Sequence, residues 1–361
     1  MKILDWYILK RYLTTFLFTL LILIPIAVAI DISEKIDKFL RDETLTLFTI
    51  VNDYYKNFII YYANTFMPLA LFIAVIVFTS RLANNTEIVA INSSQISFTR
   101  FLYPYFIGAT IVTAVALYMN HYIVPASSKT RKNFENTYLK KTRYQDQMIN
   151  DFSLQLNDST YMFVQTYDLK RNSGHQFSTE TYDGLKLKYK LIADRIRWND
   201  KDSVFTLLNW KERKIFQDRD SIFSGNKMDT VFSFTPKDFN YKSTMAQEMP
   251  SPELSEFINI SKKRGVKNLN AYLVELYKRT SLPLASYILT LIAVVLAHRK
   301  RRGGIGVNLA FGIAIMFVYV FFLKVAEVLG AVAGANSLLN VWMPNIIFGA
   351  YAVYLYINAR K

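Results

Sequence analysis

Residue types that commonly catalyse reactions or bind metals are scarce in this sequence. It has no cysteine, and its three histidines, His121, His175 and His298, lie far apart. Cysteine nucleophiles and zinc thiolate sites are therefore excluded, and clustered histidine ligands are not expected. Neither an H-E-x-x-H motif nor a glycine-rich phosphate-binding loop occurs. The sequence predicts no enzyme active site and no bound cofactor or metal ion.

Lys324 and Glu327 stand out among the ionisable residues, because they lie near the end of an apolar run, in YVFFLKVAEVLG. Charged residues at membrane depth are rare and usually face a cavity or a partner. Two interpretations stay open. The residues pair with each other at i, i+3 and stabilise only the helix end, or Lys324 lines a cavity while Glu327 holds it in place.

A second basic group follows the first apolar run, in DISEKIDKFLRDE. A helix there would carry Lys35, Lys38 and Arg41 on one broad face. The cations either form i, i+4 ion pairs with Glu34 and Asp37 on a solvated helix, or they meet lipid phosphates at a membrane surface.

Glu87 lies near the start of a polar stretch, residues 81–104, between two long apolar runs. Asn84 precedes it by three residues, which predicts a capping box in which each side chain satisfies a free backbone amide. The stretch is compatible with a short helix that inserts into a groove of a partner protein.

Six apolar runs, near the roughly 20 residues that cross a bilayer, determine where these residues lie. They cover about residues 12–30, 58–80, 101–126, 281–297, 305–323 and 338–357. The first has a rival interpretation as a signal peptide, since Ala27-Val28-Ala29 resembles a cleavage site. The run reaches Ile30 without a break, however, and is longer than the roughly 7–15 apolar residues of a signal peptide. We therefore expect six transmembrane helices.

The basic residues beside the spans predict the topology, because lysine and arginine near span ends stay in the cytoplasm. Basic residues occur at the start (Lys2, Lys10, Arg11), after the fourth span (residues 299–302) and at the end (residues 360–361). Both termini and the stretch around Glu87 are then cytoplasmic, and residues about 127–270 lie outside. The net charge of +15, from 43 basic and 28 acidic residues, fits anionic partners.

Residues 151–239 consist of short β-rich runs separated by Asn, Asp, Gly and Ser turns. In LKLKYKLIADRIRW apolar residues alternate with Lys186, Lys188 and Lys190, as in a half-buried antiparallel strand. These runs predict a β-sandwich or jelly roll. The lysines form either a solvated face or a surface for an anionic ligand. Two amphipathic helices, with Ser251 and Ser255 as possible N-caps, lead back to the membrane.

The chain resembles the LptF/LptG (YjgP/YjgQ) permease family of bacterial lipopolysaccharide export over nearly its whole length. The similar segments, in order, are MKILDWYILKRY, SRLANNTEIVAI, FTPKDF, LVELYKRTSLPLAS and VWMPN. The resemblance implies an α+β membrane protein with six transmembrane helices and a periplasmic β-jelly-roll domain between the third and fourth. The expected domains are residues 1–126 with a cytoplasmic coupling helix at about 83–98, residues 127–270 with the jelly roll, and residues 271–361.

The resemblance also implies function and partners. A multi-pass permease of the inner membrane, not itself an enzyme, would bind a dimeric cytoplasmic ABC ATPase and a paralogous or identical second permease. It would extract lipopolysaccharide and pass it to a periplasmic bridge β-jelly-roll protein; nucleic acid is not expected as a partner. Two other classes stay open: an envelope scaffold that tethers periplasmic partners by strand pairing, and a secondary transporter, which would need inverted repeats and midplane charges.

Site residues follow from the resemblance too. The resemblance implies that Glu87 couples the permease to the ATPase, together with the nearby residues Arg81, Ile88 and Ile91. Lys35, Lys38, Arg41 and Lys324, supported by Glu327, are expected to form a basic ring for the phosphorylated lipid head. Met162 and Val164 are expected to line an open apolar path through the β-domain. In SSQIS the chain has Gln95 where the family commonly has glycine.

Overall fold

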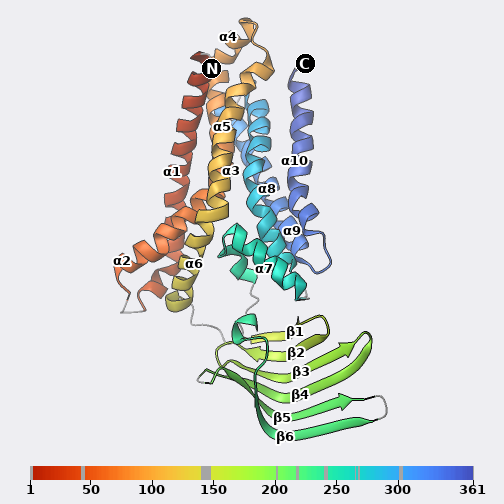
Figure 1. Ribbon diagram of the computed structural model, residues 1–361. Helices are drawn as coiled ribbons and strands as arrows, with labels where there is room; N and C mark the ends of the chain where they lie inside the picture. The colour runs from red at the N-terminus through yellow and green to blue at the C-terminus, as the bar shows by residue number, and fades with distance from the viewer. Residues whose placement is uncertain are drawn as a thin grey trace. The chain divides into compact units, whose positions relative to one another are not determined.

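The computed structural model describes residues 3–41, 45–139, 148–200, 202–216, 219–239, 243–264, 266, 269–300 and 304–360. The chain divides into two compact units. One comprises Met1–Leu139, Ala246–Leu254 and Asn270–Lys361, and the other comprises Lys140–Met245 and Ser255–Leu269. The first is a helix bundle and the second contains a β-sheet (Figure 1).

Six helical segments in the described residues are long and apolar enough to cross a membrane, so the predicted number of spans is confirmed. Several are longer than the apolar runs. Their elements are α1 (Ile3–Phe39); α2 (Leu47–Thr49), η1 (Ile50–Tyr55) and α3 (Lys56–Asn84); α5 (Phe98–Tyr118), η2 (Met119–Ile123), α6 (Val124–Phe134) and η3 (Glu135–Leu139); α8 (Asn270–Ala297); α9 (Gly304–Ala331); and α10 (Ser337–Arg360).

The bundle packs around α3 and α8, which are the most buried spans. Close approach of helices depends on glycine. Gly108 on α5 lies against the ring of the fully buried Tyr12 on α1, and Gly312 on α9 lies against Phe72 and Ile76 on α3. In contrast, α1 and α9 bury only 11% and 17% of their most apolar windows. These two helices are therefore the least buried of the six spans.

The third span continues beyond residue 126, where the sequence predicts a domain boundary. Its turns widen to a π-helix at η2, and α6 then carries Phe134 into an aromatic cluster with Tyr54 and Phe58. Burial of these rings extends the helix past the apolar run, because the cluster offers apolar contacts that the run itself no longer supplies. The unit boundary lies at Leu139.

The second unit contains one antiparallel sheet of six strands in sequential order. This order is a meander, whereas a jelly roll interleaves its strands as Greek keys, so the jelly-roll topology expected from the sequence is not observed in the described strands. The strands are β1 (Met148–Gln155), β2 (Thr160–Asp168), β3 (Ser173–Asp183), β4 (Lys186–Asn199), β5 (Val204–Ile215) and β6 (Asp220–Thr230).

One face of the sheet is apolar and is covered by the segment that follows β6. Phe232, Phe234 and Phe239, the last in the short helix η5 (Pro236–Phe239), pack on Val164 and Phe177. Tyr167 stacks on Phe239 with ring centroids 3.8 Å apart. The chain returns through η6 (Ser243–Gln247) and α7 (Ser251–Lys263). Together, α7 and the first turns of α8 are the two helices predicted here.

Candidate functional site

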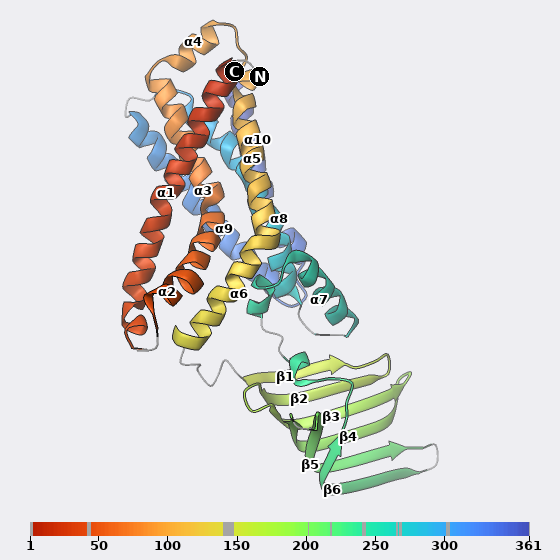
Figure 2. The ribbon, with the colours of Figure 1, turned by 60° about the vertical axis from the view of Figure 1, so that its left-hand side comes forward.

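The polar stretch between spans two and three forms a short helix, α4 (Glu87–Ser93), shorter than the predicted helix at about 83–98. Figure 2 shows α4 at the end of the bundle where α1 begins. Ile88 is buried in the bundle core and Ile91 packs against it, whereas Val89 is 62% exposed. The two isoleucines therefore fix α4 to the bundle. Val89, rather than Ile88 or Ile91, offers an apolar surface to a partner.

The carboxylate of Glu87 is held by two neighbours. The Tyr7 hydroxyl on α1 donates to Oε2 over 3.0 Å, and Asn85 Nδ2 donates to Oε1 over 3.2 Å. The predicted capping box is wrong, because Asn84 is the last residue of α3 rather than the cap of α4. The backbone carbonyl of Thr86 accepts the first helical bond of α4 instead, from the Ala90 amide.

An ion pair anchors the other end of this stretch. Arg100, near the start of α5, donates to Asp5 Oδ2 on α1 over 2.6 Å. Asp5 is only 1% exposed, so the pair is a strong constraint. Sequence reasoning missed it because the partners are 95 residues apart. Arg81, on the last turn of α3, is exposed.

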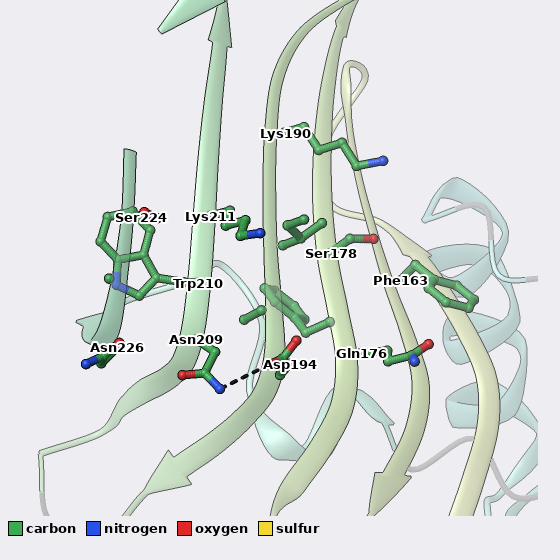
Figure 3. Close-up of a pocket in the computed structure, with 14 residues that line it drawn as sticks. Phe163, Gln176, Ser178, Lys190, Asp194, Asn209, Trp210, Lys211, Ser224 and Asn226 are labelled. Atoms are coloured by element: carbon green, nitrogen blue, oxygen red, sulfur yellow. Dashed lines mark hydrogen bonds between the residues drawn. The ribbon is translucent and has the colours of Figure 1, made fainter. Parts of the chain in front are cut away.

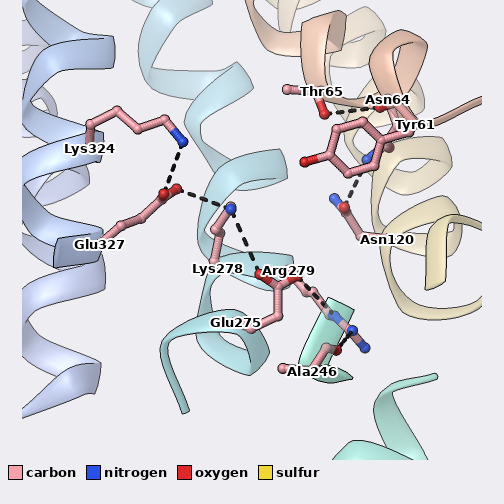
Figure 4. Close-up of polar contacts among 10 residues, drawn as sticks. All are labelled: Tyr61, Asn64, Thr65, Asn120, Ala246, Glu275, Lys278, Arg279, Lys324 and Glu327. Atoms are coloured by element: carbon pink, nitrogen blue, oxygen red, sulfur yellow. Dashed lines mark hydrogen bonds and ion pairs between the residues drawn. The ribbon is translucent and has the colours of Figure 1, made fainter. Parts of the chain in front are cut away.

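A chain of charged side chains crosses from α9 to α8 at the other end of the bundle (Figure 4). Lys324 Nζ lies 2.9 Å from Glu327 Oε2, as the i, i+3 interpretation predicts. Glu327 Oε1 is also 3.1 Å from Lys278 Nζ, which in turn approaches Glu275 at 3.8 Å. Glu327 is thus shared between two cations, and Lys324 remains 68% exposed.

The same network continues to the segment that returns from the sheet. Arg279, 3% exposed, lies 3.7 Å from Glu275 and donates to the Ala246 carbonyl over 2.7 Å and to Ser251 Oγ over 2.9 Å. Ser251 accordingly accepts a bond from Arg279. Sequence reasoning missed Glu275, Lys278 and Arg279 because they precede the apolar run of residues 281–297, although α8 extends back to Asn270 and includes them. We refer to Lys324, Glu327, Lys278, Glu275 and Arg279 as the outer charge network.

Lys35 lies near the end of α1 in a separate polar cluster. Its ammonium is 2.7 Å from Asp31 and 3.7 Å from Glu135, and it also donates to the Tyr54 hydroxyl. Asp31 accepts from Tyr54 at 3.0 Å as well. Lys35 therefore has anionic partners already and is only 21% exposed.

Lys38 and Arg41 remain exposed beside that cluster. No ion pair of the described residues joins Glu34 to Lys38 or Asp37 to Arg41, so the solvated i, i+4 pairs are not observed. Likewise, no bond in the described part of the chain joins these cations to Lys324 on α9. Within one chain, the four residues of the expected basic ring belong to two different clusters.

The β-domain residues expected to line a lipid path are inside the core of the sheet unit. Met162 is 1% exposed and Val164 is fully buried. Both face the side of the sheet that Phe234 and Phe239 cover. The residues point inward as expected, but the space that an acyl chain would need is filled by the chain's own aromatic side chains.

The opposite face of the sheet is polar and holds a trough of about 730 Å³ (Figure 3). Lys190 at its edge pairs with Glu180 at 2.7 Å, and Lys188 pairs with Asp183 at 2.7 Å. These pairs lower the pKa of Glu180, chiefly through its hydrogen bond from Lys190, and the pKa of Asp183, through that from Lys188. Because the lysines already have acidic partners, the alternating pattern fits a solvated face.

No group of three or more metal-ligating side chains occurs among the described residues. The family described as lipopolysaccharide export system permease LptF/LptG matches residues 6–358. No curated protein matches the chain. The matched range contains α4, both charged clusters and all six strands.

Proposed function

The chain belongs to the LptF/LptG family of lipopolysaccharide export permeases, and we propose that it is the membrane subunit of an ABC transporter. In this proposal it extracts lipopolysaccharide from the bacterial inner membrane and passes it to a periplasmic bridge protein. A separate dimeric ATPase in the cytoplasm hydrolyses ATP. The observation that carries the proposal is the extent of the family match, residues 6–358, which covers all six strands and all but the first and last few residues of the bundle.

The proposed orientation places α4 in the cytoplasm and the sheet in the periplasm. The basic residues Lys10, Arg11, Arg299 and Lys300 support it, because they lie at span ends on the same side as α4. The remaining basic residues of the second loop, Arg301 and Arg302, and the final Lys361 lie outside the described residues.

We propose that α4 is the docking element for the ATPase. Val89 gives it an exposed apolar contact, and Glu87 adds a carboxylate. The packing of Ile88 and Ile91 into the bundle supports this role, because a docked helix can move the spans only if it is fixed to them. Amphipathic helices commonly dock into hydrophobic grooves in this way.

We propose that lipid is handled where α1 and α9 expose their apolar faces. A second, paralogous or identical permease would place its α9 beside α1 of the first. Lys324 and Glu327 of one chain would then join Lys38 and Arg41 of the other in a basic ring. The large exposed fraction of both helices supports this pairing, since free apolar surface of this extent needs lipid or a partner.

We further propose that the sheet unit opens during transport, so that acyl chains replace Phe234 and Phe239 over Met162 and Val164. Leaving acyl chains in water would cost about 0.8 kcal/mol for each CH₂ group. An apolar interior avoids that exposure. When no lipid is bound, Phe234 and Phe239 fill the interior and keep water out.

Copurification with the ATPase tests the proposal. We expect Val89→Glu and Glu87→Arg to abolish copurification. The first places a charge in an apolar contact, and the second replaces a carboxylate by a cation and turns attraction into repulsion. Leu185→Glu is a matched control, since Leu185 is a fully exposed apolar residue in the turn before β4. Undiminished copurification of Val89→Glu would contradict the docking role of α4.

A further inference from the structure

A groove of about 1040 Å³ runs between α1 and α3 along the half of the bundle that adjoins α4. Its wall on α3 is formed by Ile73, Val77 and Arg81. The wall on α1 contains one or two residues from every turn between the N-terminus and the middle of the helix. Among them are Trp6, Tyr7, Lys10, Arg11, Phe18 and Leu23.

The chemistry of the groove changes along its length. Lys10, Arg11 and Arg81 gather at the end beside α4, whereas Phe18, Ile22 and Ile73 line the far end. The threonines between them are not free donors. The hydroxyls of Thr14, Thr15 and Thr19 donate to the carbonyls four residues earlier over 2.8–2.9 Å. The middle of the groove can therefore border hydrocarbon without leaving these donors unpaired.

The length of the groove matches one leaflet of a bilayer. Twelve residues separate Arg11 from Leu23, which is about 18 Å of helix at about 1.5 Å per residue. Half of a hydrocarbon core of about 30 Å is about 15 Å. The cations then lie at headgroup level, and Leu23 lies near the bilayer midplane. Trp6 and Tyr7 lie at the same end as the cations, as aromatic residues do at membrane interfaces.

The three cations have no anionic partner among the described residues. Arg11 lies over the Tyr7 ring at 5.7 Å, and Lys10 and Arg81 are exposed. Glu87 is near this end but is held by Tyr7 and Asn85. A protein helix seated here would need acidic residues at one end and apolar residues at the other. Every anionic phospholipid molecule has a negative charge at one end and apolar chains at the other.

We propose that the groove between α1 and α3 binds an anionic phospholipid of the cytoplasmic leaflet, with its phosphate at Lys10, Arg11 and Arg81 and an acyl chain along Phe18, Ile22 and Ile73. This site is separate from the proposed path of lipopolysaccharide, which concerns the opposite leaflet. It rests on the proposed orientation of the bundle. A lipid held against α1 beside the Tyr7–Glu87 contact occupies the place where α4 and α1 meet.

Trp6 allows a direct test, because it lines the groove and is 59% exposed. The full chain carrying Trp342→Phe has no other tryptophan in a span, and Trp198 and Trp210 in the sheet give a constant background. It is placed in neutral detergent with brominated phosphatidylglycerol or brominated phosphatidylcholine at equal mole fractions. We expect phosphatidylglycerol to quench Trp6 at an at least about fivefold lower mole fraction, given roughly 1 kcal/mol per cation near an anionic surface.

The matched variants remove two charges each from the same end of the bundle. Lys10→Gln with Arg11→Gln leaves only Arg81 and should reduce the preference by at least about fivefold, whereas Arg299→Gln with Lys300→Gln should retain it. Equal quenching by the two lipids, or equal loss in both double variants, would overturn the site. Absence of quenching by either lipid would also overturn it and would indicate that a second protein chain covers the groove. Because no transport is measured, these outcomes are independent of lipopolysaccharide export.

Discussion

The hydroxyl of Tyr7 on α1 donates a hydrogen bond to Glu87 Oε2 on α4 over 3.0 Å, across 80 residues of sequence. This bond joins the helix proposed to meet the ATPase to one of the two least buried spans. Displacement of α4 therefore acts on α1 directly, as well as through the packed helix α3.

Tyr7→Phe is expected to separate docking from transport. The variant keeps the ring and loses only the hydrogen bond to a carboxylate, which contributes about 1.5–3 kcal/mol when well shielded and less at this half-exposed site. ATPase copurification should stay normal, while lipopolysaccharide released per ATP in reconstituted vesicles should decrease about twofold to tenfold.

Asn84→Ala is the control for Tyr7→Phe, because Asn84 does not cap α4 and its removal leaves the Tyr7–Glu87 bond in place. It should behave as the unmodified protein in both assays. Normal transport by Tyr7→Phe would show that α1 does not receive its movement through Glu87.

Lys278→Met is expected to destabilise the bundle. It leaves Glu275 with Arg279 alone and Glu327 with Lys324 alone. Each partly buried carboxylate then loses one of its two cationic partners, and loss of a hydrogen bond to a charged group costs about 1.5–3 kcal/mol. Thermal unfolding of the purified chain in detergent measures the loss. Lys324→Met should change the free energy of unfolding by less than about 1 kcal/mol, because Lys324 is largely exposed. Equal effects of the two substitutions would mean that the outer charge network is not organised around Lys278.

Gly108→Ala is expected to weaken the contact between α1 and α5. A Cβ at Gly108 would overlap the Tyr12 ring, lying 2.9 Å from its Cδ1. Overpacking of this kind usually costs about 1–3 kcal/mol. Gly306→Ala is the matched control, since nothing lies within 4 Å of a Cβ there, and alanine also favours helix. If the two variants unfold at the same temperature, the packing of Tyr12 against α5 does not require glycine at position 108.

Gln95→Gly is expected to keep or raise stability. Gln95 has a φ of 59° in the turn between α4 and α5, and a side chain in this left-handed region costs about 1–2 kcal/mol. Gln95→Val should lower the unfolding temperature, because a β-branched residue tolerates this conformation least. If Gln95→Gly is less stable than Gln95→Val, residue 95 does not have the left-handed backbone conformation described here.

The spans were predictable from the sequence because apolar length alone identifies them. Their ends were not, since Phe134 continues the third span by packing on Tyr54 and Phe58 rather than by hydropathy. The strands were predictable from alternation at Leu187, Tyr189 and Leu191. Their order was not, because meander and Greek-key arrangements use the same alternation.

In the candidate site too, contacts between residues close in sequence were predictable, and contacts between distant residues were not. Lys324 and Glu327 are local in sequence, and their i, i+3 pair follows from helix geometry. Lys278 contacts Glu327 from another helix, and Arg100 pairs with Asp5, which is 95 residues away. Neither contact can be recognised from residue spacing in the sequence. The capping box failed for a related reason: α3 continues through Asn84, because its neighbours Leu82 and Ala83 are buried in the bundle core.

The central claim, that this chain carries lipopolysaccharide from the bundle into the sheet unit, is tested most directly by photo-crosslinking during transport. Crosslinking residues at Met162 and Val164 face the covered side of the sheet, and one at Phe163, on the opposite face and 38% exposed, is the control. In vesicles containing lipopolysaccharide, the second permease and the ATPase, we predict ATP-dependent adducts at Met162 and Val164 and few at Phe163. Adducts at Phe163 alone, or none at the inward positions while ATP is hydrolysed, would contradict the account.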